Sequence, residues 1–174
     1  SVLVEAERSA KGDEAANLLQ VKLLEGEQLD QELSGLAKLR SLSTVDPKRV
    51  AIVGHSFGGM LAMLLAERDP SIRSIINFGG GARSWPRSSH FRDRVLMAAS
   101  RFNTPVFSLY TTNDYSTDPG TVLDTELNRQ SKTHKLKILP AFGSSVSEGH
   151  NVVYLSIETW EREVFAFLDQ YTKP

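Results

Sequence analysis

The sequence predicts an α/β fold in which a mostly parallel sheet carries helices on both faces. Beyond residue 46, short apolar segments alternate four times with segments of helical periodicity, and this alternation is typical of parallel sheets. The 174 residues are 40% hydrophobic and 24% charged, which is the composition of a globular domain with a real core. We find no internal repeat, low-complexity stretch or linker, so we expect a single domain over residues 1–174.

The segment before residue 46 is expected to contain one long helix. Residues 1–16 are polar and small, and we predict no regular structure there. Over residues 17–42, leucines recur mostly at intervals of three or four residues, which indicates an amphipathic helix. Gly26 and Gly35 are tolerated weak points of this helix, and Asp46 begins a turn with the following proline.

The rest of the chain alternates between strands and helices. We predict strands over residues 50–53, 73–78, 105–110 and 135–139, and helices over residues 59–68, 90–102, 118–131 and 156–171. Asp118 and Pro119 suit the N-cap and the first position of the third of these helices. Ligands of such sheets bind outside the carboxyl ends of the strands, so these ends are where we expect the site.

One motif lies at such an end. The segment Gly54-His55-Ser56-Phe57-Gly58 follows an apolar strand and precedes a helix, which is the context that gives Gly-x-Ser-x-Gly a mechanical meaning. A tight turn from strand to helix projects the Ser56 hydroxyl out of the sheet, and the start of the helix leaves backbone N–H groups free. We therefore predict that Ser56 is a nucleophile. The alternative is a glycine-rich turn that only packs a helix on a strand.

A serine needs a base, and histidine serves this role near neutral pH. Of the four histidines, His55 adjoins the serine, His90 begins a helix, and His134 is expected to be a solvated loop residue. His150 lies in a polar loop between the last strand and the last helix, at the edge of the sheet where Ser56 is expected. We favour His150 as the base; its alternative role is that of an exposed loop histidine.

The base needs a carboxylate that fixes its tautomer. Asp114 follows directly after the strand 105–110, whereas Asp118 has a sufficient role as a helix cap. Glu148 is a weaker candidate because it lies only two residues from His150. We favour Asp114, and the resulting order is that of the serine, aspartate and histidine in the α/β-hydrolase fold.

These residues resemble the α/β-hydrolase superfamily, and within it the dienelactone-hydrolase-like enzymes, from about residue 46 to the C-terminus. The segment 46–59 resembles the nucleophile strand and elbow of that family, 113–117 its acid loop and 148–150 its histidine loop. The resemblance implies that Ser56 is the nucleophile, Asp114 the acid and His150 the base. Dienelactone hydrolase itself uses cysteine, so the serine points to esterase-like relatives and lactone hydrolysis is not implied.

The chain differs from the family in the segment that precedes the nucleophile elbow. Only 55 residues come before Ser56, and the four predicted strands correspond to the second half of the family's sheet. Phe57 N–H suits one oxyanion donor, but the loop that supplies the second donor has no counterpart. We therefore expect a fragment of a longer polypeptide, with a missing N-terminal segment or a second chain completing the sheet. The alternative is impaired activity.

The composition excludes several classes of protein. The absence of cysteine excludes disulfides and thiolate chemistry. The net charge of -1 argues against nucleic-acid or anionic membrane partners, and no apolar run is long enough to span a membrane. Histidines and carboxylates show no metal-binding spacing, so neither metal nor organic cofactor is expected. The N-terminus lacks the pattern of a signal peptide, which favours the cytoplasm without deciding the compartment.

The predicted function is hydrolysis of a small-molecule carboxylic ester through an acyl-enzyme. A peptidase or thioesterase of the same fold, or a non-catalytic binding module, are the alternatives. Trp85 follows the glycine-rich loop after the second strand and is predicted to wall the substrate site, while Arg83 or Arg87 would attract an acidic substrate. A buried rim residue and solvated arginines are the alternatives for these positions. The natural substrate and the oligomeric state stay open.

Overall fold

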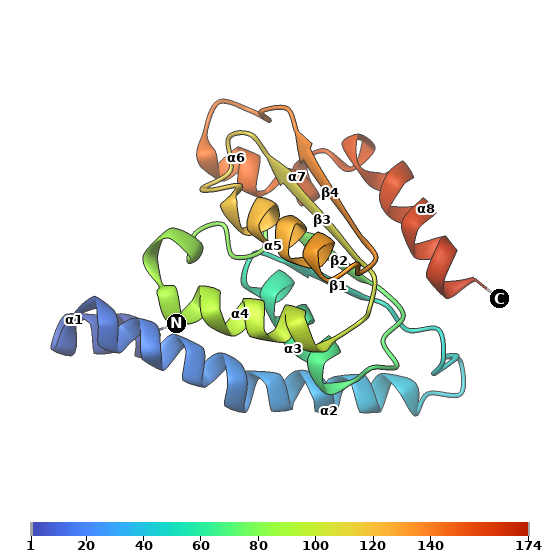
Figure 1. The fold of residues 1–174 in the computed structure, drawn as a ribbon, viewed down its shortest axis with the longest axis horizontal. Coiled ribbons are helices and arrows are strands. Elements are labelled where there is room, and N and C mark those ends of the chain that lie inside the picture. The colour runs from blue at the N-terminus through green and yellow to red at the C-terminus, as the bar shows by residue number, and fades with distance from the viewer. Residues whose placement is uncertain (1, 174) are drawn as a thin grey trace.

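A computed structural model describes residues 2–173, and its centre is a sheet of four parallel strands in the order β1-β2-β3-β4 (Figure 1). The strands are β1 (Ile52–His55), β2 (Ile75–Phe78), β3 (Val106–Thr111) and β4 (His134–Leu139). Each lies within two residues of its predicted start and end. Because all four run in the same direction, the loops after them gather at one edge of the sheet.

Helices cover both faces of this sheet. They are α1 (Val2–Leu23), η1 (Leu24–Gln28), α2 (Leu29–Arg40), α3 (Phe57–Arg68), η2 (Trp85–Arg87), α4 (Ser89–Arg101), α5 (Asp118–Arg129), α6 (Val146–His150), α7 (Val152–Leu155), η3 (Ile157–Thr159) and α8 (Glu161–Thr172). Within residues 2–173, no helix combines the length and the apolar character needed to cross a lipid bilayer.

The core is divided between the two faces of the sheet. The larger part is a cluster that includes Met63 and Leu64 of α3 and the buried apolar residues of α2 and α4. On the other face, α8 packs Val164 and Phe167 against the side chains of β2 and β3, and the Phe167 ring lies 5.5 Å from that of Phe107. Val153 of α7 packs against the same cluster, and Figure 1 shows α1 to α4 grouped away from α8.

The N-terminal region differs most from the prediction. Helix α1 includes residues 2–16, which were expected to be irregular, with a kink at Gly12, whose φ of 87° and ψ of −179° are not helical. Ser1 lies outside the described residues. The helix forms because tertiary contacts select it: Val4 and Ala16 are buried, and Asn17 Nδ2 donates a 2.9 Å hydrogen bond to the Arg87 carbonyl. The predicted long helix over residues 17–42 is also divided, with a π-helical segment at Gly26.

Three smaller predictions are corrected. Thr117 rather than Asp118 occupies the N-cap of α5, so Asp118 is the first helical residue. The final helix begins at Glu161 instead of residue 156, after the turn η3. His134 is not a solvated loop residue: it begins β4, its side chain is 12% exposed, and its Nε2 lies 3.0 Å from a carboxylate oxygen of Asp124 on α5.

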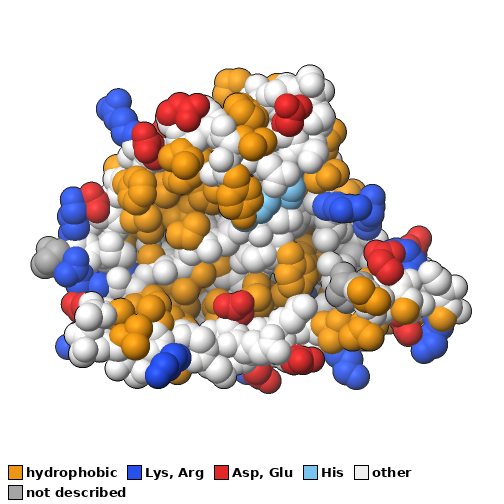
Figure 2. Space-filling view, turned by 180° about the vertical axis from the view of Figure 1, so that it is seen from behind, with side chains coloured by type: hydrophobic (Ala, Val, Ile, Leu, Met, Phe, Trp, Pro, Cys, Tyr) orange, Lys and Arg blue, Asp and Glu red, His pale blue; other side chains and the backbone are white. Residues whose placement is uncertain are grey.

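Strand β1, which carries the motif, forms one edge of the sheet. Among residues 2–173 it pairs only with β2, and Val53 in its middle is 57% exposed. Figure 2, viewed from behind, shows a hollowed face with many exposed apolar side chains. An unpaired strand edge offers free backbone donors and acceptors for a further strand.

Candidate active site

The segment after β1 places Ser56 on a sharp turn. Ser56 has φ 57° and ψ −118°, a conformation that costs a non-glycine residue free energy, and α3 begins at the next residue. Gly54 permits this turn, because a Cβ atom there would lie 2.2 Å from the Gly58 carbonyl oxygen. Two contacts hold the turn: Ser56 N–H donates to the Phe78 carbonyl at 2.8 Å, and Gly81 N–H donates to the Ser56 carbonyl at 3.3 Å.

Ser56, His150 and Asp114 form one hydrogen-bonded series. His150 Nε2 lies 2.9 Å from Ser56 Oγ, and His150 Nδ1 lies 2.7 Å from Asp114 Oδ1. The Asp114 side chain is 1% exposed and that of His150 is 9% exposed, so both ends of this pair are shielded from water. The three residues come from the segments that follow β1, β3 and β4, at the carboxyl edge of the sheet where the sequence analysis expected them.

His150 is held by a short helix rather than by the expected loop. It is the last residue of α6, which begins with a capping box: Ser145 Oγ accepts from Glu148 N–H, and the Glu148 carboxylate accepts from Ser145 N–H. This bonding holds the pKa of Glu148 below its usual range, with the Ser145 hydroxyl as the main cause. Glu148 therefore caps the helix, with its carboxylate bound to Ser144 and Ser145.

Asp114 is fixed by its own neighbours. Its Oδ1 also accepts a hydrogen bond of 2.6 Å from the backbone N–H of Tyr115. The preceding residue, Asn113, donates from Nδ2 to the Phe142 and Ser145 carbonyls, at 2.9 and 3.0 Å. These bonds tie the loop after β3 to the loop that precedes α6. Sequence reasoning missed Asn113, because only the tertiary fold brings the two loops together.

Gly79 leaves the space in which the acid and the histidine meet. A Cβ atom at this position would lie 2.9 Å from Asp114 Oδ2 and 3.1 Å from His150 Nδ1. The residue also has φ +56°, which side chains rarely tolerate. The glycine loop after β2 is anchored nearby, where the buried Tyr110 hydroxyl donates a 2.6 Å hydrogen bond to the Gly80 carbonyl. Burial raises the pKa of this phenol, so it remains a donor.

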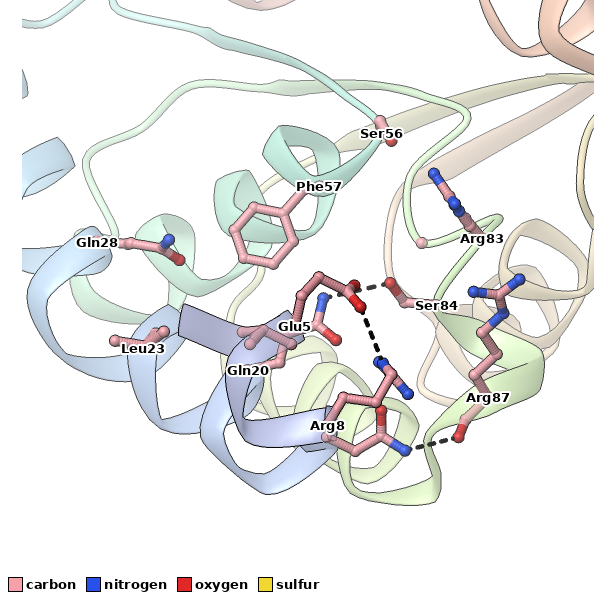
Figure 3. A pocket seen from close by; sticks show the side chains of 13 residues that line it. Glu5, Arg8, Gln20, Leu23, Gln28, Ser56, Phe57, Arg83, Ser84 and Arg87 are labelled. Atoms are coloured by element: carbon pink, nitrogen blue, oxygen red, sulfur yellow. Dashed lines mark hydrogen bonds and ion pairs between the residues drawn. The ribbon is translucent and has the colours of Figure 1, made fainter. Parts of the chain in front are cut away.

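A cavity of about 320 Å³ opens beside Ser56. It lies between the N-terminal helices and the loop after β2, and Figure 3 shows its side chains. It is lined by Val4, Glu5, Arg8, Asn17, Gln20, Leu23, Gln28, Ser56, Phe57, Gly81, Arg83, Ser84 and Arg87. Phe57, the predicted oxyanion donor, is the first residue of α3, and its N–H is among those that a helix leaves without an intrahelical acceptor.

The cavity is more cationic than acidic. Arg8 pairs with Glu5 and Asp13, whereas Arg83 and Arg87 form no ion pair with the carboxylates of residues 2–173. Arg83 instead lies over the Tyr115 ring, 5.6 Å from its centroid, and points in Figure 3 toward the side of the cavity where Ser56 lies.

Trp85 does not line this cavity, in contrast to the prediction. Its N–H donates to the Gly81 carbonyl at 2.8 Å, and the resulting turn directs the indole inward. Trp85 is 3% exposed and belongs to the apolar cluster that contains Phe91 and Val95 of α4. Burying the aromatic ring in the core is more favourable in free energy than leaving it exposed to water at the rim of the cavity.

Comparisons with known proteins place the chain in a family. The model of the dienelactone hydrolase family matches residues 4–172. Among solved structures, a putative dienelactone hydrolase from Klebsiella pneumoniae has 22% identity and a TM-score of 0.61, over 80% of this chain and 60% of that one. A Pyrococcus furiosus esterase has 14% identity and a TM-score of 0.65, over 84% of this chain and 62% of that one.

Peptidases share this fold as well. The acylaminoacyl peptidase of Pyrococcus horikoshii has 14% identity and a TM-score of 0.65, over 85% of this chain and 28% of that one. These likenesses show the α/β-hydrolase fold, and the chain spans between 28% and 62% of the length of the three structures. No curated protein sequence matches the chain.

Proposed function

Because the chain belongs to the dienelactone hydrolase family, we propose that it is a serine hydrolase that cleaves carboxylic esters. In this proposal Ser56 is the nucleophile, His150 the general base and Asp114 the carboxylate that orients the base. The observation that carries the proposal is the hydrogen-bonded series from the Ser56 hydroxyl to the buried Asp114, with heavy-atom distances of 2.9 and 2.7 Å. Such a series activates an otherwise weak nucleophile.

The reaction would proceed through an acyl-enzyme. His150 Nε2 takes the hydroxyl proton as Ser56 Oγ bonds to the ester carbonyl carbon, and Phe57 N–H donates to the oxygen that becomes negative. His150 then gives the proton to the departing alcohol oxygen as the carbon–oxygen bond breaks. The oxygen of a water molecule then bonds to the acyl carbon while His150 Nε2 takes a proton from it. His150 gives this proton to Ser56 Oγ as the bond between Oγ and the acyl carbon breaks, which releases the carboxylic acid.

An ester and an anilide that carry the same acyl group test this proposal. We expect hydrolysis of an aryl ester of an amino acid to exceed that of the matching anilide, and Ser56→Ala and His150→Ala to reduce it by at least about 10³-fold. His90→Ala, on the exposed face of α4, is the control and should retain full activity. Faster cleavage of the anilide would favour a peptidase, and full activity in His150→Ala would refute the assigned base.

Arg83 and Arg87 support a proposal about the substrate class. These two guanidinium groups line the cavity that opens beside the nucleophile and pair with no carboxylate of residues 2–173, which favours an ester that carries a carboxylate of its own. We expect the protein to hydrolyse an aryl hemisuccinate with a higher kcat/KM than the neutral butyrate ester. Arg83→Gln should remove most of this preference, by about tenfold, and leave the rate on the butyrate ester unchanged. An unaltered preference in Arg83→Gln and Arg87→Gln would contradict this assignment.

A further inference from the structure

His55, the residue before the nucleophile, contacts the loop that carries the histidine of the series. It ends β1 and is paired in register with Phe78 of β2, so its side chain leaves the sheet on the face where α8 packs. There its Nε2 lies 2.9 Å from the His150 carbonyl oxygen, and the two imidazole centroids are 4.7 Å apart. Two consecutive residues thus hold His150: Ser56 contacts its ring, and His55 its backbone.

The partners of His55 define its tautomer. A carbonyl oxygen only accepts hydrogen bonds, so His55 Nε2 must carry a proton and donate it in a hydrogen bond to the His150 carbonyl oxygen. Nδ1 is then free to accept, and the Tyr154 hydroxyl of α7 lies 3.4 Å from it. The Tyr154 ring meets that of His55 edge to face, with centroids 5.1 Å apart. Tyr154 therefore supports the tautomer that binds the carbonyl.

His55 also suits this role electrostatically. Partial burial lowers the pKa of its imidazole below the usual value, and the hydrogen bond to the His150 carbonyl only partly offsets this shift. A neutral ring at this position does not oppose the positive charge that His150 gains when it takes a proton. The carbonyl that His55 binds belongs to the last residue of α6, where a helix leaves carbonyls without intrahelical partners.

We propose that His55 is a positioning residue that clamps the His150 backbone through Nε2–H and so fixes the distance between His150 Nε2 and Ser56 Oγ. This inference rests on the proposed function, because it assigns His55 a role in the same reaction. His55 contacts neither the substrate cavity nor the carboxylate of the series. Its loss should therefore change the chemical step and leave substrate binding intact.

A set of three variants tests the clamp. His55→Leu removes the N–H, His55→Gln keeps an amide N–H that can reach the same carbonyl, and His90→Leu makes the same chemical change at an exposed position of α4. We expect kcat for an aryl ester to fall about 10- to 100-fold in His55→Leu with KM within about twofold, since small displacements of a base have effects of this size. His55→Gln should recover most of the loss, and His90→Leu should match the wild type.

Several results would overturn the clamp. These are a kcat within twofold of the wild type in His55→Leu, or equal losses in the leucine and glutamine variants. An independent readout uses nitrogen NMR of the His55 ring in the folded Ser56→Ala protein, where the clamp requires a protonated Nε2 and an unprotonated Nδ1. The opposite tautomer would refute the clamp even if a variant fails to fold. Full ester hydrolysis by Ser56→Ala would instead refute the proposed function, so the two failures are distinguishable.

Discussion

Replacing Gly79 by alanine should separate the geometry of the site from the stability of the fold. The new Cβ would lie 2.9 Å from Asp114 Oδ2, about 0.5 Å inside the ordinary contact limit of 3.4 Å. The Asp114–His150 pair must therefore retreat by a few tenths of an ångström, away from the arrangement that aligns it with Ser56. A displacement of this size is expected to cost about tenfold in kcat, or about 1.4 kcal/mol of transition-state stabilisation.

The same substitution also carries a backbone cost. Gly79 has φ +56°, and a side chain in this region costs about 1–2 kcal/mol, equivalent to a fall of roughly 2–8 °C in Tm for a chain of this size. Gly12→Ala in α1 is the matched control: its φ is +87°, but a Cβ atom there would meet no atom within 4 Å, and Gly12 does not line the cavity. Both variants should lose similar stability, measured by thermal unfolding.

Ester hydrolysis then distinguishes the two variants. We expect kcat to fall about tenfold in Gly79→Ala and to stay within about twofold of the wild type in Gly12→Ala. Equal losses of kcat in both variants would assign the effect to general destabilisation. An unchanged kcat in Gly79→Ala would refute the reasoning that its missing side chain makes room for the pair.

The remaining predictions concern charges. Asp114→Asn should lower kcat by about 10³- to 10⁴-fold without unfolding the protein, because an amide fails to stabilise the His150 imidazolium; a loss below tenfold in steady-state kinetics would contradict this. Arg94→Met should cost about 3–5 kcal/mol in urea unfolding, since Arg94 is 6% exposed and pairs with two carboxylates; a cost below 1 kcal/mol would show that these pairs add little. Hydrogen bonds from two lysines of β4 lower the pKa of Glu163 to about 2, so the stability they provide is present at neutral pH and is lost as the pH falls from about 4.5 toward 2. Acid unfolding should therefore be shallower in Glu163→Gln over this range, and identical pH profiles would exclude a contribution from these bonds.

The alternating region of the fold was predictable because its signals are local. Each buried strand is a short apolar run bounded by polar or turn residues, α3 is a longer apolar run directly after the motif, and α4 follows from helical periodicity. Helix α1 was not predictable in the same way. Its sequence has little amphipathic pattern, and the contacts that select the helix, such as Asn17 with the Arg87 carbonyl, join residues 70 positions apart.

The candidate site was predictable where topology fixes it. Parallel strands bring their carboxyl ends together, so Ser56, Asp114 and His150 were expected to meet at one edge of the sheet, and the structure brings them together. Trp85 shows the limit of that reasoning, since its position after a strand indicates the edge but not whether the side chain turns inward. The contacts of His55 were likewise missed, because a residue beside a nucleophile carries no signal of a partner 95 positions away.

The most direct test of the account is the reaction of the folded protein with a fluorophosphonate, followed by intact mass measurement and peptide mapping. An activated serine is expected to give one adduct, located on Ser56, and none in Ser56→Ala. His150→Ala should react far more slowly, because its serine lacks a base. A folded wild-type chain that gains no adduct, or gains it at another residue, would contradict the assignment of Ser56 as the nucleophile.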